Sequence, residues 1–158
     1  INDNIFKPTN NSFFPWFLQQ NQVGVDGNPF FSHIIKDPKD PKVKSFVTPI
    51  FITMVARFAH KHKLPCSRVL RSCLNLTFHI KEPTVKHTDF DDDEDYFQTI
   101  LYLNDGGGDT IIYDKEDTSK EIKRIKPKKW KMICFGNHYH KAETPEAGYR
   151  VAFVTVFK

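Results

Sequence analysis

The sequence is poor in cysteine and contains no long apolar run. It has three cysteines, Cys66, Cys73 and Cys134, and no two of them form a C-x-x-C pair. An odd count without such a pair argues against a disulfide framework and a zinc ribbon, and it is typical of a reducing compartment. No stretch reaches the roughly 20 apolar residues that a membrane-spanning helix needs, and no signal peptide is recognisable. We therefore expect a cytoplasmic protein with no membrane partner.

The net charge is also too small to identify a partner. Lysine and arginine total 23 and aspartate and glutamate total 19, which leaves +4 at pH 7. Acidic residues concentrate between Asp89 and Asp95, and basic residues concentrate in the segment 120–131. We interpret the basic segment as a solvated hairpin, with attraction of an anionic partner as the alternative. Nucleic acid is not an expected partner, and nothing in the sequence indicates the oligomeric state.

The apolar and aromatic content is sufficient for a folded domain. The 158 residues are 39% hydrophobic and include fifteen phenylalanines, which can bury a core and suits a single domain spanning residues 1–158. Residues 1–47 show no regular period. From Thr48, the expected N-cap, with Pro49 at the first helical position, apolar residues recur at spacings of three and four. This spacing predicts one helix that ends before Pro65.

After Pro65 the hydrophobic period changes to two, which is the period of β-strands. In the first such stretch the alternation predicts two faces, one with Leu70, Leu74, Leu76 and Phe78 and the other with Arg71, Cys73, Asn75 and Thr77. Further strands are predicted at 96–103, 110–113, 130–135 and 149–157, and the glycine-rich segment 104–109 predicts a tight turn. We predict a mainly β fold in which residues 66–158 form a barrel or jelly roll and residues 1–65 provide irregular and helical support.

A histidine and an aspartate stand two residues apart at the start of the acidic run. In a strand, positions i and i+2 point to the same face, so His87 and Asp89 could reach one metal ion. A third ligand is available in "GNHYHKAETPEAGYR", where His138 and His140 have the same parity, so strand geometry does not choose between them. Two histidines and one carboxylate are the ligand set of non-haem Fe(II) oxygenases. Arg150 follows, and the bidentate fork of an arginine is well suited to hold a dicarboxylate co-substrate.

The acidic run also has interpretations that involve no such site. A calcium-binding EF-hand loop needs a glycine at its sixth position, a glutamate at its twelfth and flanking helices. The run from Asp89 onward meets none of these requirements. We therefore expect residues 91–95 to form a solvated loop, because dense carboxylates repel one another.

From about Leu70 to its end, the chain resembles the Fe(II)/2-oxoglutarate-dependent oxygenases, most closely their prolyl-4-hydroxylase-like branch. The likeness rests on segments in the same order and at similar spacing: "HTD" (87–89), "TILYLND" (99–105), "GGDT" (107–110), "IKPKKWKMICF" (125–135) and "HKAETPEAGYR" (140–150). The aromatic start "FFPWF" (13–17) is similar to that of small phage- or bacterial-type oxygenases. Ahead of the H-x-D the chain departs from the family, because it has "NLTFHIKEP" where many relatives have a Tyr-Pro pair.

The resemblance implies a double-stranded β-helix (jelly-roll) barrel with an iron site inside it. His87, Asp89 and His140 would be the iron ligands and, with Arg150, the catalytic residues. His140 is preferred to His138 because the family places its basic residue about ten positions after the last histidine, and Arg150 stands at that interval from His140.

The resemblance also implies a binding site for 2-oxoglutarate. Arg150 would bind the C5 carboxylate of this co-substrate. Tyr102 matches a tyrosine whose hydroxyl often joins that arginine. Asn75 and Thr77, on the polar face of their predicted strand, are further candidates for contact with the co-substrate.

As the resemblance implies, the chain would hydroxylate a C–H bond with Fe(II), 2-oxoglutarate and O2, with ascorbate as a supporting reductant. A peptidyl proline in a peptide or protein is the family-based substrate, while a free amino acid, another small molecule and a nucleic acid stay open. A function of a different class is a β-barrel binding module that keeps the fold without the chemistry. The presence of all four predicted catalytic residues favours the enzyme.

Overall fold

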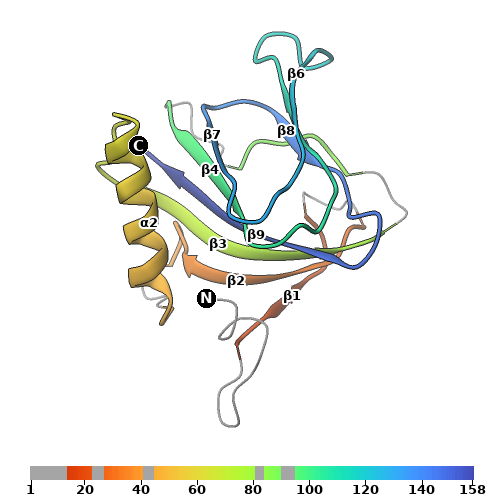
Figure 1. Ribbon diagram of the computed structural model, residues 1–158, viewed down its shortest axis with the longest axis horizontal. Helices are drawn as coiled ribbons and strands as arrows, with labels where there is room; N and C mark the ends of the chain where they lie inside the picture. Colours follow the sequence, from red (N-terminus) through yellow and green to blue (C-terminus); the bar gives the residue numbers. More distant parts are fainter. Residues whose placement is uncertain (1–13, 23–26, 41–44, 81–83, 90–94) are drawn as a thin grey trace.

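The computed structural model describes residues 14–22, 27–40, 45–80, 84–89 and 95–158 of the chain, and Figure 1 shows their arrangement. The elements are, in chain order, β1 (Phe17–Gln19), β2 (Phe30–Lys36), α2 (Thr48–Lys61), β3 (Val69–Phe78), β4 (Phe97–Tyr102), β5 (Thr110–Tyr113), β6 (Glu121–Ile125), β7 (Met132–Phe135), β8 (His140–Ala142) and β9 (Tyr149–Phe157). None of the helices in these described ranges is both long and apolar enough to cross a membrane.

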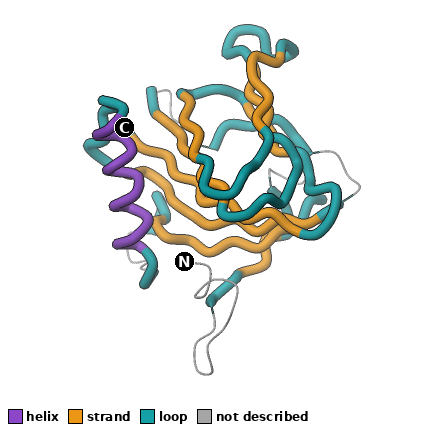
Figure 2. Tube along the Cα trace, viewed as in Figure 1, coloured by secondary structure: helices purple, strands orange, loops and turns teal. Residues whose placement is uncertain are grey.

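The strands form two antiparallel sheets. The larger sheet has the order β1-β2-β3-β9-β4-β7 and the smaller has the order β6-β5-β8. The last strand, β9, lies inside the larger sheet, because it pairs with β3 on one side and β4 on the other. Figure 2 shows α2 standing at one side of a body made of strands and loops.

The two faces of the larger sheet serve different purposes. On one face, Phe51 and Val55 of α2 pack in the main core cluster with Phe153 of β9, and the Phe51 and Phe153 rings lie 4.4 Å apart between centroids. On the other face, Ala152 and Val154 of the same strand line a cavity. The alternation of side chains along a strand therefore gives β9 one face for the helix and one for the cavity.

The prediction that Leu70 shares a face with Leu74 is wrong. Leu74 belongs to the helix-side core, whereas Leu70 packs in a separate cluster with Tyr96 and Val156. The cause is an irregularity in the pairing of β3 with β9, where the register shifts between Val69 and Arg71. One extra residue in one strand reverses the faces of the residues that precede it.

The predicted helix is present, but its N-cap is not Thr48. Val47 is the cap residue, no side chain caps the helix, and a proline stands in the first turn. The Thr48 hydroxyl lies 3.5 Å from the carbonyl oxygen of Ile35 in β2. The backbone carbonyl of Ser45 accepts the Thr48 N–H at 3.1 Å, so a turn starts the helix one residue earlier than the sequence suggests.

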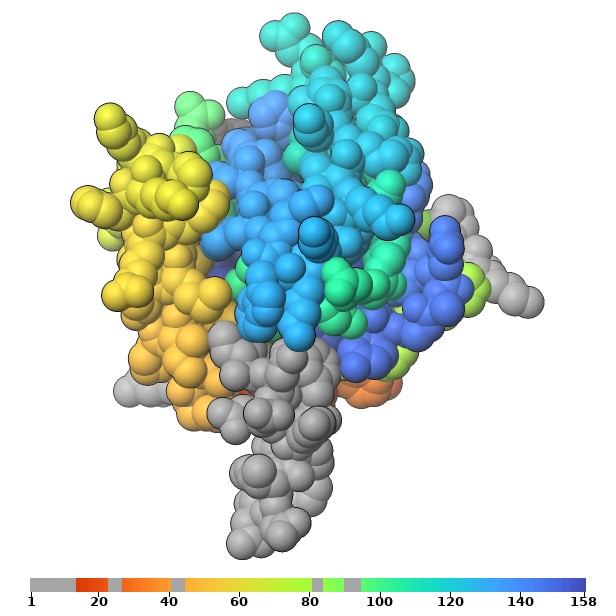
Figure 3. Space-filling view, viewed as in Figure 1, coloured from red at the N-terminus to blue at the C-terminus, as the bar shows by residue number. Residues whose placement is uncertain are grey.

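The basic segment 120–131 begins as an exposed strand. β6 pairs with β5 and is exposed along most of its length, and Figure 3 shows this hairpin standing out from the body of the molecule. After β6, the backbone N–H of Trp130 donates to the carbonyl of Tyr102, the last residue of β4. The second half of the basic segment therefore lies at the Tyr102 end of β4. Gln98 is near the other end of this strand.

Candidate metal centre

The backbone brings His87 and His140 to the same place. His87 forms an isolated antiparallel bridge with His140, the first residue of β8, through two N–H to O hydrogen bonds of 2.9 Å each. Paired residues of an antiparallel bridge project their side chains to the same side. The two imidazole rings accordingly lie 4.5 Å apart between centroids.

Asp89 completes a group of three possible ligands. Its Oδ1 lies 3.7 Å from Nε2 of His87, and its Oδ2 lies 3.9 Å from Nε2 of His140. One ligand atom from each of the three residues lies within 4.8 Å of the others. This spacing is compatible with one ion bound between them, at ligand distances of about 2.0–2.2 Å for nitrogen and oxygen.

The second ring nitrogen of each histidine is occupied by a backbone carbonyl. Nδ1 of His87 lies 3.1 Å from the carbonyl oxygen of Val85, and Nδ1 of His140 lies 3.3 Å from that of His138. A carbonyl oxygen only accepts, so both Nδ1 atoms carry the proton and both Nε2 atoms keep a lone pair. This arrangement fixes the tautomer that a metal-binding histidine needs.

The electrostatic surroundings keep the site in its metal-binding protonation state. Burial alone would raise the pKa of the Asp89 carboxyl, but His140, Arg71 and His87 outweigh it and hold that pKa below its usual range. Burial also lowers the pKa of His140, to about 4. At neutral pH, Asp89 is therefore a carboxylate and His140 is a neutral imidazole.

Because of His140, the metal-free protein should lose stability on acidification. The unfolded imidazole takes up a proton at its ordinary pKa of about 6.5, whereas the folded one does so only near 4. The unfolded state thus binds the proton first, and the free energy of unfolding should fall by about 1.5 kcal/mol between pH 6.5 and pH 5. Urea unfolding of wild type and His140→Gln with a chelator at both pH values measures this.

The variant His140→Gln should show a smaller loss over this pH interval. The exposed helix residue His60 offers a matched control, because His60→Gln should keep the full loss. Equal pH dependence in wild type and His140→Gln would contradict the prediction.

Two residues at the site were not singled out from the sequence. Nε2 of Gln98 donates to Oδ2 of Asp89 and lies 3.2 Å from Nε2 of His140. Nη1 of Arg71 donates to Oδ1 of Asp89 at 3.2 Å. The alternation of side chains along β3 places Arg71 on the same face as Asn75. This alternation could have identified Arg71 as a site residue from the sequence. The sequence indicates Gln98 less clearly, because it is only the one amide side chain in a mostly apolar strand.

The three candidate ligands open into a cavity of about 90 Å³ between the two sheets. Its lining includes the other predicted site residues as well: Asn75, Thr77, Tyr102 and Arg150. His138, the alternative third ligand, does not lie among the lining residues. Of the acidic run, residues 91–94 lie outside the described residues, and the Asp95 side chain is 99% exposed.

Arg150 is a buried cation, and the described part of the chain places no carboxylate beside it. It is 4% exposed, and its Nη1 donates to the carbonyl oxygens of Gly108 at 2.6 Å and Glu143 at 2.9 Å. Burial lowers the pKa of its guanidinium, although an arginine stays charged in proteins. No carboxylate among the described residues lies within 4.0 Å of it. A buried charge is costly unless it is paired, so this end of the cavity suits an anion.

Polar atoms beside Arg150 also suit a ligand. Thr77 faces Arg150 across the β3–β9 pairing. Its Oγ1 and Oδ1 of Asn75 are buried and have no hydrogen-bond partner among the described residues. The Tyr102 hydroxyl donates to Oγ1 of Thr110 at 2.7 Å, and no hydrogen bond joins it to Arg150 in the described structure. Buried polar groups are normally hydrogen-bonded, so the atoms of Asn75 and Thr77 fit a polar ligand.

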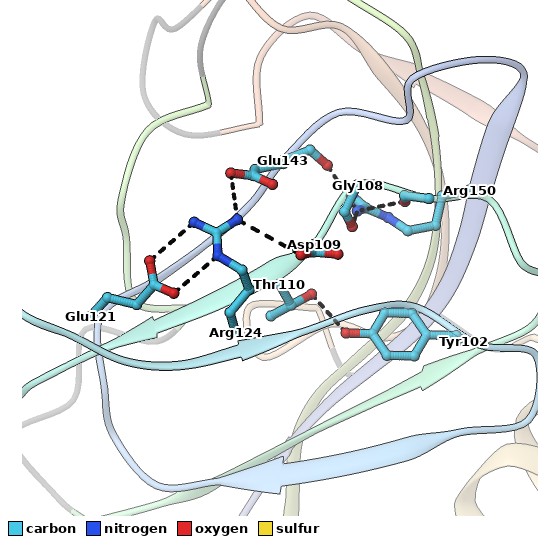
Figure 4. Close-up of polar contacts among 9 residues, drawn as sticks. Tyr102, Gly108, Asp109, Thr110, Glu121, Arg124, Glu143 and Arg150 are labelled. Carbon is cyan, nitrogen blue, oxygen red and sulfur yellow. Dashed lines mark hydrogen bonds and ion pairs between the residues drawn. The ribbon is translucent and has the colours of Figure 1, made fainter.

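A second arginine fixes the backbone that holds Arg150. Arg124 of β6 pairs with Glu121 at 3.0 Å, with Glu143 at 2.9 Å and with Asp109 at 3.7 Å, as Figure 4 shows. The carbonyl of Glu143 is one of those that accept from Arg150. The ion pairs of Arg124 therefore restrain Glu143, and the backbone carbonyl of Glu143 orients the buried Arg150.

The turn that supplies the other carbonyl requires glycine. A Cβ on Gly108 would lie 2.2 Å from the carbonyl oxygen of Glu143, and its φ is +73°. A Cβ on Gly106 would lie 2.3 Å from the carbonyl oxygen of Tyr149. Gly106 thus lets the turn approach the strand that carries Arg150, and Gly108 lets it approach Glu143, just after β8.

Replacing Gly108 should cost more stability than replacing Gly148. Both have a positive φ, +73° and +69°, but no atom of the described residues lies within 4 Å of a Cβ on Gly148. Gly148→Ala should therefore cost only the conformational strain of about 1–2 kcal/mol, and Gly108→Ala should add about 1–3 kcal/mol from overpacking. Urea unfolding of both variants measures the difference. Equal losses would show that the close approach at Gly108 is unimportant.

No known family model matches the sequence, and no curated protein matches it. Solved structures do match. A 2OG-Fe(II) oxygenase family oxidoreductase from Burkholderia pseudomallei is similar over 90% of this chain and 73% of its own, with a TM-score of 0.71 and 13% identity. A prolyl-4-hydroxylase from Pseudomonas putida is similar over 82% of this chain and 71% of its own, with a TM-score of 0.56 and 19% identity.

A third structure is a prolyl hydroxylase from Trichoplax adhaerens in complex with a peptide fragment of the hypoxia inducible factor oxygen degradation domain. It is similar over 81% of this chain and 62% of its own, with a TM-score of 0.57 and 14% identity. At these identities the likeness concerns the fold. The chain has the fold of 2OG-Fe(II) oxygenases and prolyl-4-hydroxylases, and the predicted mainly β jelly roll with a supporting helix is confirmed.

Proposed function

We propose that the chain is an Fe(II)- and 2-oxoglutarate-dependent dioxygenase that hydroxylates a C–H bond of its substrate. The observation that carries this proposal is the convergence of His87, Asp89 and His140 on one point inside a fold that oxygenases share. Two histidines and one carboxylate with open positions are typical of non-haem Fe(II) oxygenases.

The residues present fit this metal. His87, Asp89 and His140 would hold it, and Gln98 and Arg71 orient the carboxylate by donating to its two oxygens. Such outer contacts usually matter for metal affinity. Bound Fe(II), together with 2-oxoglutarate and O2, supplies the oxidising power to hydroxylate an unactivated carbon. The protein contributes ligands, orientation and a partly enclosed cavity.

Arg150 is the residue we assign to the distal carboxylate of 2-oxoglutarate. Its burial, its lack of a carboxylate partner among the described residues and its place in the cavity lining support this role. Tyr102, Asn75 and Thr77 present further polar atoms to the same cavity. A dicarboxylate can thus be held by charge at one end and approach the metal ligands at the other.

For the substrate, we propose a prolyl-hydroxylase-like activity on a peptide or protein. The prolyl hydroxylases that share the fold support this choice, and one of them was solved with a peptide. The assignment of the metal and the co-substrate does not depend on the identity of the substrate. It can therefore be tested before the substrate is known.

The decisive experiment measures succinate formed from 2-oxoglutarate by the purified protein with Fe(II) and ascorbate. We expect slow turnover that needs Fe(II) and stops when Zn(II) replaces it, and that increases when a pool of proline-containing peptides is added. Binding of Fe(II) without any succinate would indicate the non-catalytic binding module instead. Absence of specific Fe(II) binding would overturn the whole assignment.

A further inference from the structure

We propose that Arg71 binds a carboxylate of the substrate, so that the site selects substrates with one negative charge close to the reacting carbon. This inference rests on the proposed function, because it assumes a divalent metal ion at His87, Asp89 and His140 and 2-oxoglutarate beside Arg150. It concerns a residue that touches neither of them directly and meets the metal site only through its hydrogen bond to Asp89.

Arg71 lies where a substrate would enter. It lines the same cavity as the candidate metal ligands, yet its side chain is 32% exposed while Arg150 is 4% exposed. The regular register of β3 with β9 sets Arg71 opposite Val156, on the same cavity face as Asn75. Arg71 thus reaches from solvent to Asp89.

The described residues use little of the hydrogen-bonding capacity of Arg71. Among the described residues its guanidinium makes one hydrogen bond, from Nη1 to Oδ1 of Asp89. A guanidinium has five N–H donors in a planar fork. The donors on Nε and Nη2 are therefore available to a planar acceptor with two oxygens, which is the geometry of a carboxylate.

The charge balance of the cavity also favours the binding of one more anion. Among its described lining residues, Arg71 and Arg150 are cations and Asp89 is an anion. A divalent metal ion with neutral histidine ligands raises the total to three positive charges, and 2-oxoglutarate neutralises two of them. Among these groups one positive charge stays uncompensated in a partly buried site, which is unfavourable; Asp37, the other acid that acts on Arg71, lies outside the lining. A monoanionic substrate group would balance it.

This balance favours a carboxylate over a phosphate. A phosphate monoester carries about −1.5 to −2 at pH 7 and would leave excess negative charge, whereas a carboxylate carries one. The carboxylate could be the side chain of an acidic residue next to the target in a peptide, or the α-carboxylate of a free amino acid or chain end. Both sources have the same chemistry at Arg71, and the experiment separates them.

The experiment uses protein loaded with Zn(II) and 2-oxoglutarate, after saturation with both has been measured. Ligand-observed NMR then compares three matched pairs: acetate with acetamide, N-acetyl-L-proline with N-acetyl-L-prolinamide, and acetyl-Asp-Pro-amide with acetyl-Asn-Pro-amide. The second pair tests an α-carboxylate and the third tests a side-chain carboxylate. Inorganic phosphate is the probe for the other anion class.

In at least one pair, the carboxylate should bind at least about tenfold more tightly than its amide, because a hydrogen bond to a charged group is lost in the amide. Arg71→Gln should remove this preference, and Arg71→Lys should retain part of it because the charge is kept. Arg68→Gln is the matched control, since Arg68 is exposed and, within the described part of the chain, only its backbone is hydrogen-bonded, to Lys158. It should leave the preference unchanged.

Three results would overturn the inference while the proposed function stands. They are equal binding of carboxylates and amides to the loaded protein, tighter binding of phosphate than of any carboxylate, and a loss of 2-oxoglutarate affinity in Arg71→Gln as large as the loss for the probes. The last result would make Arg71 a co-substrate ligand. Failure of the wild type to load Zn(II) or 2-oxoglutarate would instead show that the proposed function is wrong.

Discussion

Asp89→Ala and His140→Ala should each abolish specific binding of Fe(II) or Mn(II). Each change removes one of three ligand atoms that lie within 4.8 Å of one another, and the remaining two cannot enclose an ion. Loss of outer-shell partners alone typically costs 10–100-fold in affinity, so removal of a ligand should cost more than about 100-fold. Equilibrium binding of Mn(II), followed by electron paramagnetic resonance, measures it.

The acidic run provides the control for this prediction. Asp95 belongs to the same run, but its side chain is 99% exposed. Asp95→Ala should therefore bind Mn(II) as the wild type does. The same is expected of Asp91→Ala and Asp93→Ala, at positions outside the described residues. If these loop acids mattered as much as Asp89, the run would act as a diffuse cation trap and the three-ligand site would be wrong.

Strand parity explains how much of the site could be predicted from the sequence. The i, i+2 rule placed His87 and Asp89 on one face, and the structure brings their ligand atoms together. The same rule could not separate His138 from His140, because both have the same parity. The separation depends on the pairing of His87 with His140, a contact between segments about fifty residues apart that local periodicity does not encode.

The remaining errors and omissions have the same origin. A register shift in β3 reverses the face of Leu70, and nothing in the local sequence marks the extra residue. Gln98 was not predicted from the sequence, because its role depends on the fold that brings its amide beside Asp89 and His140. The mainly β fold could be predicted because period-two alternation repeats in strand after strand. Contacts across the cavity could not be predicted, because they are set by register and long-range pairing.

Arg150→Lys should weaken 2-oxoglutarate much more than it weakens the metal. Two carbonyls, of Gly108 and Glu143, hold one nitrogen of the Arg150 guanidinium and so orient the rest of the fork. Lysine keeps the charge but has no fork and cannot meet both carbonyls and a carboxylate in the same geometry. A lost charged hydrogen bond contributes about 1.5–3 kcal/mol, so affinity for 2-oxoglutarate should fall by roughly 10–150-fold. Mn(II) affinity should change by less than about threefold.

A shorter 2-oxo acid makes this test specific for the distal carboxylate. Pyruvate has the 2-oxo acid group of 2-oxoglutarate but lacks its C5 carboxylate, so Arg150→Lys should bind pyruvate about as well as the wild type does. Tyr102→Phe is the matched comparison, because its hydroxyl donates a neutral hydrogen bond to Thr110 and its loss should cost only about 0.5–1.5 kcal/mol. Calorimetry with Zn(II)-loaded protein measures both 2-oxo acids in all three proteins. An equal loss of pyruvate and 2-oxoglutarate in Arg150→Lys would mean that the cavity has been distorted. Unchanged 2-oxoglutarate binding would show that Arg150 does not hold the distal carboxylate.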